Sequence, residues 1–129
     1  MRKTRTALGA LLLGAGALVV APSAGGVAAA RADDERPWAK GVEKDTQAQA
    51  LALFREGNGL LKDNFFPKAA TKYREALKLW DHPAIHYNLV LALMNMNQPI
   101  EVLEHLDAAM RYGEAPLDPE KFAQAQRLK

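Results

Sequence analysis

The chain has 129 residues, with 17 lysine and arginine residues against 15 aspartate and glutamate residues, and it has no cysteine. A chain of this length forms one small domain. The lack of cysteine excludes disulfides, thiolate metal ligands and a cysteine nucleophile. Four of the 17 basic residues precede Asp33, whereas all 15 acidic residues lie at or after it. The net positive charge therefore belongs to the N-terminus and does not indicate nucleic-acid binding.

The first 32 residues have the three-part composition of a secretory signal peptide. Basic side chains near Met1 precede an uncharged run of 14 residues, 7–20. Ala30-Arg31-Ala32 fits the A-x-A pattern, which predicts cleavage after Ala32 and a mature chain in the periplasm or secreted, without membrane contact. The alternative is an uncleaved membrane anchor, for which the run is shorter than the ~20 residues that span a bilayer.

Prolines divide the rest of the chain into predicted helices. Residues 33–45 are polar and are expected to form a linker. Proline is tolerated in the first turn of a helix but not in its interior. Apolar residues with helical spacing follow the later prolines, and the predicted helices are 47–62, 67–80, 83–96, 99–112 and 118–129. No segment alternates with period two, so the fold class is expected to be all-α, with about five helices.

The chain matches itself after a shift of 33 residues. The matched pairs include Phe54 with Tyr87, Leu60 with Leu93, and Ala76 with Ala109. Because the shift is constant, one antiparallel helix–turn–helix unit is expected to occur twice, over about 47–80 and 83–113, followed by the helix 118–129. Small residues such as Gly57 and Ala76 predict close approach of the helices.

This pattern resembles the tetratricopeptide repeat (TPR) family, whose repeat is a helix–turn–helix of about 34 residues with small residues at fixed positions. The family's small residue in the first helix falls on Gly57, and its alanines in the second helix fall on Ala69 and Ala76. Valines replace two of these residues in the second repeat. The resemblance implies a TPR-like α-solenoid over residues 46–129.

The sequence indicates no catalytic, cofactor or metal site. It contains no G-x-S-x-G, phosphate-loop or paired-carboxylate motif, and its single serine, Ser23, lies in the predicted signal peptide. The protein is therefore expected not to be an enzyme. His82 and His86 have a spacing that can bind zinc. Without a third ligand they are interpreted as surface or capping residues, and His105 as solvated.

The resemblance implies a binding function instead, because the first helices of successive TPR units line a concave face. The matching positions are Phe54, Asn58, Leu61 and Lys62 in the first unit and Tyr87, Asn88, Leu91 and Asn95 in the second. The expected partner is a protein or peptide of the bacterial envelope, whose extended backbone the asparagines can hydrogen-bond. The alternative is that the apolar members simply cover neighbouring helices.

A second class of function is structural. In this hypothesis the chain is a self-associating module, or the N-terminal stalk of a larger envelope protein. The helix 118–129 would then dock on a second copy or on further repeats, because its apolar positions would otherwise face water.

Overall fold

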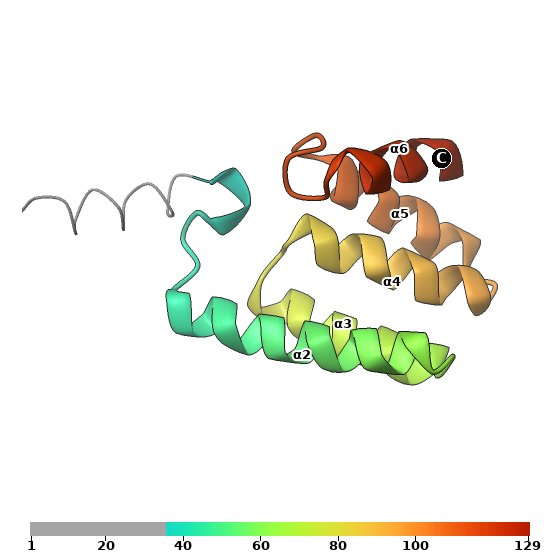
Figure 1. The fold of residues 1–129 in the computed structure, drawn as a ribbon, viewed down its shortest axis with the longest axis horizontal. Coiled ribbons are helices and arrows are strands. Elements are labelled where there is room, and N and C mark those ends of the chain that lie inside the picture. Colours follow the sequence, from blue (N-terminus) through green and yellow to red (C-terminus); the bar gives the residue numbers. More distant parts are fainter. Residues whose placement is uncertain (1–35) are drawn as a thin grey trace, which may run out of the picture.

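The computed structural model describes residues 36–129, so the predicted signal peptide and its cleavage after Ala32 lie outside the described residues. The helices are η1 (Pro37–Ala39), α2 (Lys44–Lys62), α3 (Phe66–Leu79), α4 (Pro83–Asn95), α5 (Pro99–Met110) and α6 (Pro119–Leu128). Residues 36–129 contain no strand, which confirms the all-α fold class. None of the helices in this range is both long enough and apolar enough to span a membrane. In Figure 1, α4 lies between α2 and α6.

Prolines mark the helix starts as predicted. Each of α3, α4, α5 and α6 has a proline in its first turn. Two starts also have a side-chain cap: the His82 Nδ1 atom accepts a hydrogen bond from the Ala84 amide at 3.0 Å, and Asp118 accepts one from the Lys121 amide at 2.9 Å. Such caps satisfy amide groups that lack partners inside the helix. Only α2 has no proline in its first turn, and it begins at Lys44 instead of the predicted residue 47.

The same type of turn joins the two helices of each hairpin, α2 to α3 in the first and α4 to α5 in the second. Asn64 and Asn97 both have positive φ, 63° and 53°. The Phe65 amide donates to the Leu60 carbonyl at 2.9 Å, and the Gln98 amide donates to the Leu93 carbonyl at 3.2 Å. This bond across five residues, with a left-handed residue inside it, is the Schellman helix end. The repetition seen in the side-chain types is therefore present in the backbone as well.

Two apolar clusters hold the hairpins together. The first joins α3 to α4 and includes Ala69, Ala76 and Leu89, with partly buried side chains of α2 against it. At its edge, a Cβ added to Gly57 would lie 2.6 Å from the Tyr73 ring, so α2 and α3 meet where a side chain is missing. The second joins α4, α5 and α6 and consists of Tyr87, Val90, Leu106, Ala109, Leu117 and Ala125.

The segment before α2 packs against the end of α3. Ala39 and Trp80 are buried together with Ala50, and Trp38 packs against them. The indole nitrogen of Trp80 donates to the Trp38 carbonyl at 2.6 Å. This part of the expected linker is therefore attached to the first hairpin.

Candidate functional site: the face of α2, α4 and α6

Side-chain hydrogen bonds connect the first helices of the successive units. The Asn88 amide nitrogen on α4 donates to Asn58 Oδ1 on α2 at 2.7 Å. The Tyr87 hydroxyl on α4 donates to Gln124 Oε1 on α6 at 2.6 Å. These contacts place α4 between α2 and α6, as Figure 1 shows. The α2–α4–α6 face is defined here by Asn58, Lys62, Asn88, Asn95 and Gln124.

Asn58 and Asn88 form the polar centre of this face. Asn58 Oδ1 also accepts a hydrogen bond of 2.8 Å from the Tyr73 hydroxyl. Burial raises the pKa of Tyr73 to about 12, so its hydroxyl keeps its proton and remains a donor at neutral pH. Among residues 36–129, the amide nitrogen of Asn58 and the amide oxygen of Asn88 make no hydrogen bond. Together they offer a donor and an acceptor, which are the two groups that a peptide unit needs.

The apolar residues predicted for this face mainly pack against neighbouring helices. Phe54 and Leu61 lie against the first cluster, and Leu91 lies against the second. The Phe54 ring is 5.9 Å from the Tyr73 ring, measured between centroids. Tyr87 is only 3% exposed, because α6 lies over it. These four residues shape the face but offer a partner little free surface.

The other two predicted residues lie in solvent at the same end of α2 and α4. Lys62 is exposed in the last turn of α2, where a positive charge interacts favourably with the helix dipole. Asn95 is exposed as well, and its amide nitrogen donates to the Leu91 carbonyl at 2.8 Å. The structure thus brings together Asn58 and Asn88, and it places Lys62 and Asn95 one to two turns further along their helices.

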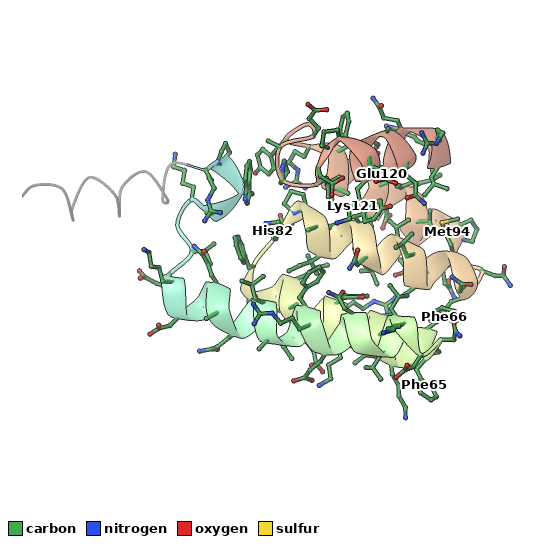
Figure 2. All side chains as sticks on the ribbon, in the orientation of Figure 1. Phe65, Phe66, His82, Met94, Glu120 and Lys121 are labelled. Atoms are coloured by element: carbon green, nitrogen blue, oxygen red, sulfur yellow. The ribbon has the colours of Figure 1, made fainter. Side chains whose placement is uncertain are left out.

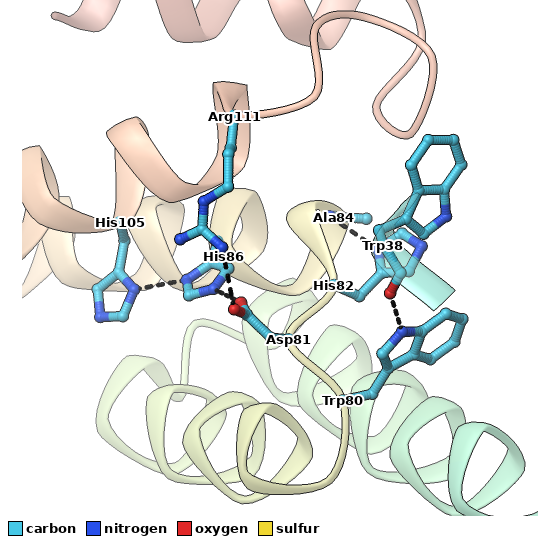
Figure 3. Close-up of polar contacts among 8 residues, drawn as sticks. All are labelled: Trp38, Trp80, Asp81, His82, Ala84, His86, His105 and Arg111. Carbon is cyan, nitrogen blue, oxygen red and sulfur yellow. Dashed lines mark hydrogen bonds and ion pairs between the residues drawn. The ribbon is translucent and has the colours of Figure 1, made fainter. Parts of the chain in front are cut away.

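A polar cluster that the sequence analysis missed lies between α4 and α5. His86 Nε2 is 2.5 Å from Asp81 Oδ1, and His86 Nδ1 is 2.7 Å from His105 Nδ1 (Figure 3). Arg111 donates to Asp81 Oδ2 at 3.1 Å. His86 is only 9% exposed and His105 is half-buried, so the predictions of a surface His86 and a solvated His105 were wrong. The capping interpretation of His82 is confirmed.

Burial sets the charge state of this cluster. It lowers the pKa of His86, against the opposing effect of Asp81, and it lowers the pKa of His105, with His86 as the next cause. Burial acts to raise the pKa of Asp81, but hydrogen bonds from His86 and Arg111 outweigh it and leave that pKa below its ordinary value. At neutral pH the cluster therefore contains two neutral imidazoles and one carboxylate.

A cavity of about 560 Å³ opens beside the histidines, lined by Arg74, Leu77, Lys78, Asp81, His86 and His105. In residues 36–129 no three histidine, aspartate or glutamate side chains gather as metal ligands would. The lining residues include no serine, threonine or cysteine. The cluster is therefore described as a hydrogen-bonded chain, separate from the α2–α4–α6 face.

Comparison of the chain with protein-family models, curated proteins and solved structures finds no match.

Proposed function

We propose that this protein is an exported, non-catalytic TPR-like scaffold that binds an extended segment of another envelope protein on its α2–α4–α6 face. The observation that carries the proposal is the Asn58–Asn88 pair, which joins two successive first helices and keeps one donor and one acceptor unpaired among the described residues. The Tyr73 hydroxyl orients Asn58 from behind, so the pair is held in place before a partner arrives. Preorganised polar groups lose less conformational entropy on binding.

The rest of the face supports an extended ligand. Gln124 continues the polar row onto α6, and Lys62 and Asn95 continue it toward the hairpin turns. An extended peptide presents its N–H and C=O groups along its length, so it can be bound by a row of amide side chains rather than by one deep pocket. The positive charge of Lys62 favours a peptide with an acidic side chain at that end.

Selection of extended peptides from a displayed random library against the full chain tests this function. We expect the selected peptides to bind Lys62→Glu and Asn88→Leu several-fold more weakly than the parent. Lys78→Glu is the matched control, because Lys78 has the same charge and also lies in the last turn of its helix, α3. Equal loss with Lys78→Glu, or equal binding by all variants, would refute the proposed face.

Export needs its own experiment, because residues 1–32 lie outside the described range. We expect expression of the full chain in a bacterial host to yield an envelope fraction that begins at Asp33. An N-terminus at Met1 in that fraction would contradict cleavage and favour an anchored chain. Recovery only inside the cell would contradict export.

The second candidate is a self-associating module. Ile100 and Leu103 on α5 are 75% and 50% exposed, and Phe65 is 53% exposed. Figure 2 shows Phe65, Phe66 and Met94 at the end of the molecule that carries the hairpin turns. If these exposed apolar side chains form the contact between two copies of the protein, the sedimentation coefficient of the full chain depends on concentration, and Ile100→Lys removes that dependence. A monomer at all concentrations would exclude this candidate.

A further inference from the structure

The two histidines of the polar cluster between α4 and α5 face each other in a nearly straight line. Their Nδ1 atoms are 2.7 Å apart and their ring centroids are 5.0 Å apart (Figure 3). The centroid of an imidazole ring lies about 1.1 Å from each ring nitrogen, so the distance between the centroids is close to the distance between the nitrogens plus two such radii. The two centroids and the two nitrogens therefore lie nearly on one line, which is the arrangement that hydrogen bonds prefer. Two ligands of one metal ion would instead aim their lone pairs at a third point. The contact is therefore a hydrogen bond and holds one proton between two nitrogens.

Asp81 determines which nitrogen of His86 carries a proton. The Asp81 carboxylate can only accept, and it accepts from Arg111 on one oxygen and from His86 Nε2 on the other. A neutral His86 with its proton on Nε2 has a lone pair on Nδ1. His105 must then donate its own Nδ1 proton across the 2.7 Å contact. In this row of hydrogen bonds, His105 therefore donates to His86, and His86 donates to Asp81.

The hydrogen-bonded row can accept one additional proton without losing a hydrogen bond. If it binds to His105 Nε2, the existing hydrogen bonds stay as they are. If it resides on His86, the shared proton belongs to His86 Nδ1 and His105 accepts it. A second additional proton makes both rings cationic, and two N–H groups then point at each other across 2.7 Å. That state has no hydrogen bond and places two like charges in contact, so the contact must open.

We propose that His86 and His105 form an acid-sensitive latch between α4 and α5, which keeps its hydrogen bond with one added proton and opens with the second. The latch joins separate parts of the chain. Asp81 follows α3, His86 lies in the first turn of α4, and Arg111 follows α5. Opening therefore loosens the C-terminal end of α5 and the connection to α6, while the first apolar cluster, which lacks all of these residues, stays intact.

Neighbouring charges determine how far the pH must fall. Positive charge on Arg111, which acts on His86, and on Arg74, which acts on His105, opposes protonation. Lys78 in the cavity wall and the nearby His82 act in the same direction when charged. Asp81, Glu101 and Glu104 favour protonation. Burial adds to the opposing side, and the pKa of each histidine lies below its ordinary value, so the latch opens in acid and is closed at neutral pH.

Amide hydrogen exchange on the full chain, from about pH 7 to about pH 4 and corrected for intrinsic rates, tests the latch. We expect protection over residues 105–112 to fall at least several-fold more than protection in α3. His105→Gln should abolish this difference, because glutamine can donate or accept but takes no proton. His82→Asn is the control that keeps a capping side chain, and its loss of protection in residues 105–112 relative to α3 should match the parent's. Unchanged protection in the parent, or the same loss in His105→Gln, would overturn the latch.

Nitrogen-15 NMR of the histidine rings gives a second test that needs no variant. At neutral pH, His86 should carry its proton on Nε2 and His105 on Nδ1. Both rings should then titrate together in two separate steps, because each proton changes the pKa of the other ring. Two rings that titrate independently, or a His86 protonated on Nδ1 at neutral pH, would contradict the latch even if the exchange data agreed with it.

Discussion

Replacing Gly57 by alanine tests how closely α2 packs against α3. The new Cβ would lie 2.6 Å from Tyr73 Cε1 and 2.9 Å from Cδ1. Carbon atoms in contact prefer about 3.5–4.0 Å, so the ring must move by about 1 Å. Tyr73 is fully buried, and its hydroxyl is bonded to Asn58. The ring therefore cannot move without disturbing both the first cluster and that hydrogen bond.

Several contributions determine the magnitude of the effect. Inserting a methyl group into a packed core costs about 1–3 kcal/mol, and losing the Tyr73 hydrogen bond adds about 1 kcal/mol. Alanine is favoured over glycine inside a helix by about 1 kcal/mol, which acts in the opposite direction. We expect Gly57→Ala to lower the free energy of unfolding by about 1–3 kcal/mol in urea denaturation followed by circular dichroism.

Gly59 provides the control on the same helix. A Cβ added there meets nothing within 4 Å, so only the helix-propensity term applies. Gly59→Ala should therefore raise the free energy of unfolding by up to about 1 kcal/mol. In a Tyr73→Leu background, most of the loss from Gly57→Ala should disappear, because the clashing ring is gone. If both alanines stabilise the parent equally, α2 and α3 do not meet at Gly57, and the close packing of this hairpin is refuted.

Three further predictions concern other parts of the fold. Ala76→Leu, at a fully buried position, should lower the thermal midpoint by several degrees, whereas Ala52→Leu, at an exposed one, should leave it within about one or two degrees. Burial lowers the pKa of His82 from 6.5 to about 4, so the unfolded chain binds the proton first and stability falls as the pH drops through that window. His82→Asn, which retains a cap, should remove up to about 3 kcal/mol of this loss in urea titrations at pH 7 and pH 4. Trp80→Phe removes the 2.6 Å hydrogen bond to Trp38 and should increase proteolysis of residues 36–43 while α2 remains intact; unchanged proteolysis would show that packing alone holds that segment.

The helices could be predicted because each has a local cause. Prolines begin four of them, and the apolar spacing shows how far they continue. The start of α2 was predicted three residues too late, since no proline or side-chain cap marks it. The turns at Asn64 and Asn97 agree with the repeated helix–turn–helix unit that the 33-residue shift predicts, although a sequence comparison alone does not reveal that both residues have positive φ.

Pairings across helices could not be predicted in the same way. Whether His86 meets His105 depends on how α4 and α5 are rotated about their axes, and spacing within one helix does not determine that rotation. One signal was nonetheless available: α4 is apolar on nearly every side, so a histidine within it had to be buried and needed a polar partner. Tyr87 was predicted to lie on the binding face, but α6 covers it. That contact is tertiary, so the spacing within α4 does not reveal it.

α4 carries both polar features, and its geometry separates them. His86 and Asn88 are two residues apart, which places them about 200° apart around the helix, on nearly opposite sides. Ile85, Leu89 and Leu93 hold α4 in the first cluster, to which α5 contributes the partly buried Val102 but neither His105 nor Arg111. Acid opening of the His86–His105 contact should therefore leave the Asn58–Asn88 hydrogen bond in place. We expect the side-chain amide NMR signals of Asn88 to keep their positions across the pH range in which protection of α5 is lost; if they shift together with the α5 signals, α4 moves as a whole and the two sites are coupled.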